Sequence, residues 1–222
     1  QHDLAAFLTS DPKGQVLPGY VQTTAERLET EQAALFDEVQ LLNRNIEHVK
    51  EIVAMQQSYA KVSGVVETLT IKDLVEDAVR LNEAALTRHG VTVVRQYDEV
   101  PLISIDKHRA LQIVFNLIRN AKYALDESAR PDKRLVLRVA RVDPDRVQIA
   151  VSDNGIGIPE ENLTRIFSHG FTTRKDGHGF GLHSGALAAK ELGGSLSVRS
   201  DGPGLGATFV LELPLKQPGN VR

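Results

Sequence analysis

Two glycine-rich motifs in this chain have the composition to approach a ligand closely. D-N-G-I-G at 153–157 follows a strand-like run, 147–152, and G-H-G-F-G-L at 177–182 precedes a helix-like run, Ala186 to Leu192. Glycine permits positive φ and close backbone approach, and the unpaired N–H groups at a helix start favour a phosphate. Asp153 is a lone acceptor at the strand end, suited to an amino group such as that of adenine. Together the motifs predict a nucleotide pocket.

The segment between the motifs is polar and cationic. It runs from Ser168 to Asp176 and contains His169, Arg174 and Lys175. Such a segment, flanked by glycine and poor in core residues, is typical of a mobile cover. Either motif alone more often marks an ordinary turn, and no Walker lysine follows the second. Their order, together with a third motif upstream, favours a ligand site with a lid.

The third motif is F-N-L-I-R-N-A-K-Y-A-L at 115–125, within an amphipathic helical pattern. Asn116 and Asn120 lie one turn apart, where the apolar arc meets the polar one. Buried carboxamides need partners, and bonds to nearby backbone would satisfy them. Two carboxamides on one face of a helix also suit a hard cation such as Mg²⁺. This ion takes few protein ligands and completes its coordination shell with waters and phosphate oxygens.

Composition places the chain among soluble globular proteins. It has 222 residues, 41% hydrophobic and 25% charged, and a net charge of −3. This balance gives no argument for binding nucleic acid or a membrane. There are no cysteines, and neither a signal peptide nor a membrane-length apolar run is present. We expect a cytoplasmic location for this stretch, with a membrane anchor in a longer parent protein left open.

An α/β pattern begins at Val65. Helices are expected over Ile71 to Arg88, with Leu74, Val75, Ala78, Leu81 and Ala85 inward, over about 107–127 after an N-cap at Asp106, and over His183 to Leu192. Val65–Leu69 is expected to be a short strand or a linker. Strands are expected at Val91–Tyr97, Leu102–Ile105, Arg134–Val142, Arg146–Ser152, Ser195–Ser200 and Ala207–Leu213. The predicted class is α+β, a two-layer α/β sandwich with a mixed sheet.

The N-terminal part predicts a helical appendage. A short helix over Asp3 to Thr9 and a loop over Ser10 to Gly19 are followed by one long helix, with no Pro or Gly between Val21 and Ser63. Its aliphatic residues form a heptad seam that needs a partner, which favours a homodimer: Leu28, Leu35, Val39, Leu42, Ile46, Val49 and Val53. The expected domains are 1–64 and 65–216, with a tail at 217–222.

Five motifs in order resemble the ATP-binding domain of sensor histidine kinases, in the superfamily shared with gyrase and mismatch-repair ATPases. They are N-L-I-R-N-A (116–121), D-N-G-I-G (153–157), F-S-H-G-F-T-T-R-K (167–175), G-H-G-F-G-L (177–182) and G-L-G-A-T-F (204–209). The resemblance covers about 66–214 and implies a Bergerat-type ATP-binding fold. The long helix is similar to the second helix of the dimerisation hairpin that precedes this domain.

The resemblance implies a role for each matching residue. Asn120 would bind Mg²⁺, with Asn116 beside it, and Asp153 would accept a hydrogen bond from the adenine amine. Gly204 and Gly206 would shape a turn near the pocket. The implied ATP-binding set is Asn116, Asn120, Tyr123, Asp153, Gly155, Gly157, Ile158, Phe167, Thr172, Thr173, Arg174, Lys175, Gly177, His178, Gly179, Phe180, Gly181, Leu182 and Thr208.

The chain departs from the family pattern in three places. Tyr123 stands where many members have Lys, with Lys122 one place earlier, so the side chain that meets the phosphates there is open. Arg174 holds a lid position that is usually Lys. The third departure is that the helix carrying the family's acceptor histidine is reduced to a stub. We assign that role to none of His2, His48, His89 and His108, and expect a fragment that begins after the acceptor.

The expected function is the ATP-binding catalytic part of a two-component sensor histidine kinase. The γ-phosphate would pass to a histidine on a dimerisation helix and then to an aspartate of a response regulator. Gyrase-type relatives carry a carboxylate four residues before the metal-binding Asn, where this chain has Asn116, so ready hydrolysis is not expected. A protein-serine kinase of the anti-sigma type and a non-catalytic nucleotide-binding interaction module are the alternatives.

Overall fold

The computed structural model describes residues 4–60, 66–128, 130–174 and 179–215. The chain separates into two compact units, of which the first ends at Ala54 and the second begins at Met55. Helices α1 (Leu4–Ser10) and α2 (Pro12–Ala60) account for the N-terminal part. None of the helices that the structure describes is long and apolar enough to span a membrane.

The long helix α2 confirms the predicted continuous helix, and its described seam residues face solvent. Leu28, Leu35, Val39 and Leu42 are each more than half exposed. Phe36, beside the seam, is 64% exposed. The side chains of Ile46, Val49 and Val53 lie outside the described ones. Within the described residues the seam is therefore an apolar stripe that its own helix does not bury.

The predicted loop over Ser10 to Gly19 is wrong, because α2 already begins at Pro12. Proline suits the first helical position, where its missing N–H has no intrahelical partner, and Asp11 Oδ1 accepts from the Lys13 N–H at 2.8 Å. Pro18 lies inside the helix, which continues past it with one hydrogen bond fewer. Pro12 thus occupies a helix-start position, which composition alone does not reveal.

Five strands form the main sheet, in the order β2-β4-β5-β7-β6. β2 pairs parallel to β4 and the other neighbours are antiparallel, which confirms the predicted mixed sheet. Their bounds are β2 Thr92–Tyr97, β4 Arg134–Asp143, β5 Arg146–Asp153, β6 Ser195–Arg199 and β7 Ala207–Pro214. The central strand β5 ends at Asp153, which places the first glycine motif at the edge of the buried sheet.

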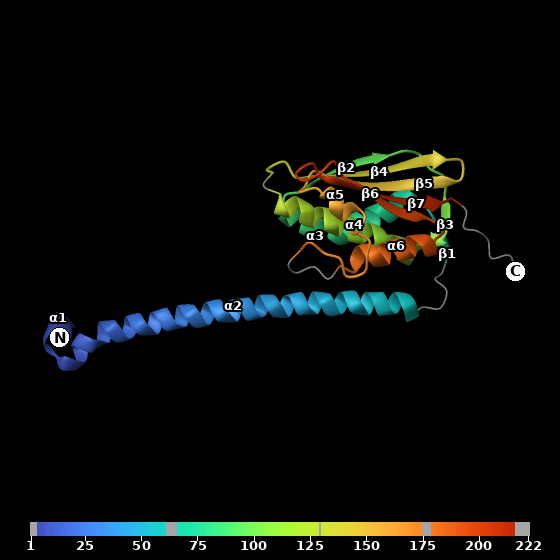
Figure 1. The fold of residues 1–222 in the computed structure, drawn as a ribbon. Helices are drawn as coiled ribbons and strands as arrows, with labels where there is room; N and C mark the ends of the chain where they lie inside the picture. The colour runs from blue at the N-terminus through green and yellow to red at the C-terminus, as the bar shows by residue number, and fades with distance from the viewer. Residues whose placement is uncertain (1–3, 61–65, 129, 175–178, 216–222) are drawn as a thin grey trace. The chain divides into compact units, whose positions relative to one another are not determined.

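Three helices cover one face of this sheet, α3 (Ile71–Arg88), α4 (Lys107–Glu127) and α6 (Gly181–Glu191) (Figure 1). This confirms the two-layer α/β sandwich. Alternate residues of β5, Val147, Ile149 and Val151, are fully buried. A separate antiparallel pair joins β1 (Val66–Leu69) to β3 (Ile103–Asp106), and the short helix α5 (Glu160–Leu163) was not predicted.

The buried stripe of α3 differs from the expected one in the second half of the helix. Ala85 was expected inward and is only half-buried, whereas Leu86 is buried. Leu81 was expected inward but is 63% exposed, whereas Asn82 is 6% exposed. Asn82 Nδ2 donates to the carbonyl of Ala78 at 2.9 Å, so the buried amide has a partner within its own helix. The helical period places position 82 on the stripe with Ala78 and Leu86. The prediction chose Leu81 in place of Asn82 because it considered only the hydrophobicity of the side chain.

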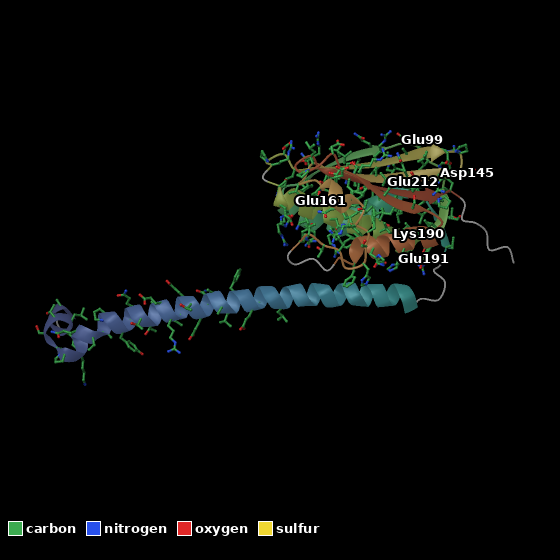
Figure 2. All side chains as sticks on the ribbon, viewed as in Figure 1. Glu99, Asp145, Glu161, Lys190, Glu191 and Glu212 are labelled. Carbon is green, nitrogen blue, oxygen red and sulfur yellow. The ribbon has the colours of Figure 1, made fainter. Side chains whose placement is uncertain are left out.

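The central helix α4 is held at both its start and its side. Asp106 is the predicted N-cap, and its Oδ1 accepts from the Arg109 N–H at 3.1 Å. Arg109 also pairs with Glu191, which lies next to Lys190 at the C-terminal end of α6 (Figure 2). This ion pair ties the far end of α6 to the first turns of α4 and leaves the glycine-rich start of α6 beside the middle of α4.

Candidate functional site

Asp153 is a buried acceptor at the end of β5, with 8% of its surface exposed. Burial raises the pKa of its carboxyl group to about 6, and backbone N–H groups of Gly155 and Ala207 only partly oppose this. The N–H of Gly155 donates to Asp153 Oδ1 at 2.9 Å. The remaining acceptor capacity of this carboxyl group is poorly hydrated, so a donor from a ligand would be bound strongly.

The motif after Asp153 is fixed against α4 by a glycine. A β-carbon at Gly155 would lie 2.5 Å from both the carbonyl carbon and oxygen of Ala124. The N–H of Ile156 donates to that same carbonyl at 3.1 Å. Only glycine allows this approach without a shift of backbone, so the loop and the second half of α4 form one wall.

The other side of this loop contacts the turn between β6 and β7. Gly157 has φ +70°, and a β-carbon there would collide with the carbonyl oxygen of Gly202. The N–H of Gly204 donates to the Ile156 carbonyl at 2.6 Å. Gly206, at φ +74°, lies directly against the carbonyl of Asp153. The predicted turn near the pocket is thus packed onto the D-N-G-I-G loop.

Asn116 and Asn120 lie half-buried on α4. Within the residues that the structure describes, neither carboxamide makes a hydrogen bond, so the alternative of backbone partners is not realised there. A β-carbon at Gly181 would lie 3.9 Å from Asn116 Cγ, which places this amide opposite the first residue of α6. Two half-buried amide oxygens one helical turn apart fit a hard cation. Elsewhere among the described residues no cluster of three or more His, Asp or Glu could hold a metal.

The two glycine motifs meet the same helix at different heights. The D-N-G-I-G loop contacts α4 at Ala124, and the start of α6 faces it at Asn116. These positions are eight residues apart, about 12 Å along a helix axis. The wall between them carries Asn120 in its middle. The arrangement is an elongated site. A buried acceptor lies at one end, and the first N–H groups of α6, which have no partner within their own helix, lie at the other.

The described part of the lid reaches α4 through an arginine. The guanidinium carbon of Arg174 lies 3.5 Å from the centroid of the Tyr123 ring. Thr172 Oγ1 accepts from the Arg174 N–H at 3.2 Å, and Thr172 and Thr173 are exposed. The predicted site residues Lys175, Gly177 and His178 lie outside the described residues. The lid cation is thereby held over the helix that carries the two asparagines.

The start of α6 packs onto the first part of the lid. Gly179 has φ +69°, and a β-carbon there would meet the backbone of Gly170 and Phe171. The ring of Phe180 lies 4.9 Å from that of His169, centroid to centroid. Phe180 provides no side-chain cap for α6. Three further predicted site residues are half-buried against the core: Ile158, Phe167 and Leu182.

Comparison with known proteins identifies this architecture. The family model described as histidine kinase-, DNA gyrase B- and HSP90-like ATPase matches residues 105–217, just over half of the chain. The chain belongs to this family. Residues 105–217 form an ATP-binding catalytic domain of the histidine kinase type. This match confirms the family that the sequence motifs resemble.

The similar curated proteins are sensor kinases. Sensor histidine kinase TmoS of Ectopseudomonas mendocina is 30% identical over 175 residues, which covers 78% of this chain and 18% of TmoS. Sporulation kinase E of Bacillus subtilis is 24% identical over 224 residues, which covers 99% of this chain and 29% of the kinase. The chain therefore spans less than a third of the length of these relatives.

Solved structures show the same fold. The nucleotide-free catalytic domain of histidine kinase ThkA is 24% identical, with a TM-score of 0.60, covering 68% of this chain and 98% of that one. Full-length ShkA in complex with AMPPNP is 24% identical, with a TM-score of 0.62, covering 72% of this chain and 33% of ShkA. These likenesses show the fold of most of the second unit.

One predicted residue is not brought to the site of this ATPase domain. Thr208 pairs with Ser152 in the β5–β7 register, and Thr208 Oγ1 donates to Ser152 Oγ at 2.9 Å. Neighbouring residues of a strand face opposite sides of a sheet, so Thr208 lies on the face away from Asp153. Its neighbour Ala207 is the residue that pairs with Asp153.

Sequence reasoning also missed a residue that supports the ATPase site. Ser200 Oγ accepts from the Ile158 N–H at 3.0 Å and donates to the carbonyl of Gly206 at 2.6 Å. This single hydroxyl joins the D-N-G-I-G loop to the turn before β7. No sequence signal could have found it, because a serine at a strand end is common and the two loops are distant along the chain.

Proposed function

We propose that this chain binds ATP together with Mg²⁺ and serves as the catalytic part of a sensor histidine kinase. The observation that supports this best is the position of α4. This one helix contacts the D-N-G-I-G loop at Ala124 and faces the start of α6 at Asn116. Three kinds of group follow one another along the site. The buried carboxyl would meet the base of ATP, the two amides would meet its metal ion, and the N–H groups at the start of α6 would meet its phosphates.

Asp153 would bind the adenine through its exocyclic amine. The carboxyl is buried beneath the D-N-G-I-G loop and already accepts one backbone N–H from Gly155. An amine that donates to the remaining lone pairs would satisfy a group that water reaches poorly. Ile158 would supply apolar surface beside the base. Gly157 would keep the floor of the pocket flat.

At the phosphate end, Asn120 would bind Mg²⁺ with Asn116 beside it. An ion held by these amides would supply positive charge beside the phosphates. Arg174 of the lid would add a second positive charge, and the unpaired N–H groups at the start of α6 would donate to phosphate oxygens. Neither asparagine can accept a proton at neutral pH. The site would therefore orient ATP without activating water.

The γ-phosphate would pass to a histidine supplied by a dimerisation helix, and from there to an aspartate of a response regulator. The short helix α1, which is all that remains of the helix expected to carry the acceptor, contains no histidine. We propose that the acceptor is not in this chain. The exposed stripe of α2, from Leu28 through Leu35, Val39 and Leu42, would pair with a second copy. TmoS and the other named relatives are much longer than this chain, which agrees with a catalytic part of a larger kinase.

Titration calorimetry with ATP, with and without Mg²⁺, tests the proposal. We expect binding that strengthens with Mg²⁺ and no stable self-labelling from γ-labelled ATP. Absence of ATP binding in either condition would overturn the nucleotide site. Acid-labile label on this chain would overturn the proposal that the acceptor histidine lies outside it. Acid-stable label on an added protein would indicate a serine kinase instead.

A further inference from the structure

At the phosphate end of the proposed site, the α4 position where many family members have Lys holds Tyr123. The ring of Tyr123 is covered by Arg174 of the lid, so it offers neither charge nor an open face. α4 itself must supply any further positive charge from a neighbouring residue. Lys122 and Arg119 are the two candidates within one turn of Asn120.

Lys122 is committed to an ion pair with Asp126 of the same helix. Its Nζ lies 2.9 Å from Asp126 Oδ2, and only 13% of its side chain is exposed. Asp126 also contacts Lys133 at 3.1 Å and His89 at 3.0 Å. Burial works to raise the pKa of Asp126, but the hydrogen bonds from Lys122 and Lys133 outweigh it and hold that pKa below its usual value. Lys122 therefore neutralises a charged carboxylate of its own helix, and the Asp126–Lys133 pair joins α4 to the residue before β4.

Arg119 lies where the phosphates would be. A β-carbon at Gly181 would lie 3.9 Å from Arg119 Nη2 and 3.9 Å from Asn116 Cγ. The guanidinium and the amide thus border the same space at the first residue of α6. The guanidinium carbon is 5.8 Å from the centroid of the Phe115 ring, which supports its position along α4. An arginine is charged at every working pH and can bind two phosphate oxygens with its fork of donors.

We propose that Arg119 binds the terminal phosphates of the nucleotide and takes the place of the lysine that Tyr123 replaces. This inference rests on the proposed function, because it names a further ligand within that site. Arg119 and Arg174 would then approach the phosphates from opposite sides, one from α4 and one from the lid. The base end of the site, at Ala124 and Asp153, lies beyond the reach of this contact.

Affinities for ATP, ADP and adenosine, measured with Mg²⁺ on the whole chain, test the proposal. Arg119→Ala should weaken ATP binding about ten- to hundredfold, as expected for loss of a charge-assisted contact, and should change adenosine binding less than about twofold. Arg119→Lys should recover part of the loss. Lys122→Gln tests the other candidate on α4 and should weaken ATP binding less than Arg119→Ala does, because Lys122 is paired with Asp126.

Each result decides the question. An equal loss for ATP and adenosine would show a structural role for Arg119 and overturn the proposal, as would unchanged ATP affinity in Arg119→Ala. A loss in Lys122→Gln that matches the one expected of Arg119→Ala would transfer the role to Lys122. If the unmutated chain binds none of the three compounds, the proposed function itself fails, and the thermal unfolding of each variant shows separately that it is folded.

Discussion

Arg174 of the lid stacks on Tyr123 of α4, with its guanidinium carbon 3.5 Å from the ring centroid. Lys122 Nζ approaches the same ring at 4.3 Å. An aromatic face attracts a cation by about 0.5–2 kcal/mol, according to how far it is desolvated. Because both partners are half-buried, the stack anchors the lid at a position beside Asn120.

Replacement of Tyr123 should release this anchor. In Tyr123→Ala we expect faster amide hydrogen exchange over residues 165–174, and ATP affinity lower by about two- to thirtyfold. Tyr123→Phe is the matched control, since it keeps the ring and should retain both properties. Equal protection of the lid in the Ala and Phe variants would show that the stack does not hold it.

Asp153→Asn should weaken ATP binding while stabilising the fold. Asparagine keeps an oxygen for the Gly155 N–H but loses the charge that strengthens the bond to the adenine amine. We expect the affinity for ATP to fall by about 1–3 kcal/mol. Calorimetry checks this, and an unchanged dissociation constant would remove Asp153 from the adenine pocket.

The same carboxyl group makes the stability of the domain depend on pH. Its pKa is raised from 3.8 to about 6 in the folded state, so the folded state retains this proton to higher pH than the unfolded chain does. Its contribution is fully present below about pH 4 and is lost as pH rises through about 6, a change of about 3 kcal/mol. Urea unfolding of Asp153→Asn should lack this decline. The same slope in both proteins would contradict the assignment.

Gly155 should not tolerate a side chain. An added β-carbon would lie 2.5 Å from the backbone carbonyl of Ala124, where no flexible group can move aside. Gly155→Ala is expected to lower the free energy of unfolding by about 1–3 kcal/mol and to weaken ATP binding. Gly19→Ala is the control, because space there is open within α2 and alanine favours a helix. Comparable stability of Gly155→Ala and the unmutated chain would refute the close contact.

Local sequence patterns predicted most of the helices and strands, because the formation of these elements depends on residues close together in the sequence. The bounds of α3 follow from its apolar period, and the start of α4 follows from Asp106 as N-cap. Errors arose where a position was judged by residue type alone. Leu81 was placed inward in preference to Asn82, and Pro18 was taken as the sign of a loop.

The parts of the site that sequence could not provide are long-range contacts. The link from Ser200 to Ile158 and Gly206 spans loops on different strands, and nothing local distinguishes it. The face on which Thr208 lies depends on the β5–β7 register, which becomes known only when the strands are paired. The position of Arg119 beside Gly181 follows from the packing of α6 on α4, although Arg119 lies within a motif that was identified from the sequence.

The exposed seam of α2 predicts self-association. Leu28, Leu35, Val39 and Leu42 are each more than half exposed, and burial stabilises each such side chain by about 1.5–3 kcal/mol. A second copy that presents the same stripe would bury it in a two-fold dimer. We therefore expect sedimentation of this chain as a dimer at tens of micromolar.

A charge in the seam should separate the two copies and spare the nucleotide site. Leu35→Asp would place a carboxylate in the apolar stripe, where it cannot be hydrated within the interface, and should yield monomers that still bind ATP. Ala34→Asp is the matched control, since it adds the same charge one residue away, off the seam, and should remain dimeric. If the unmutated chain sediments as a monomer at this concentration, or if both variants dissociate equally, the seam is not the interface.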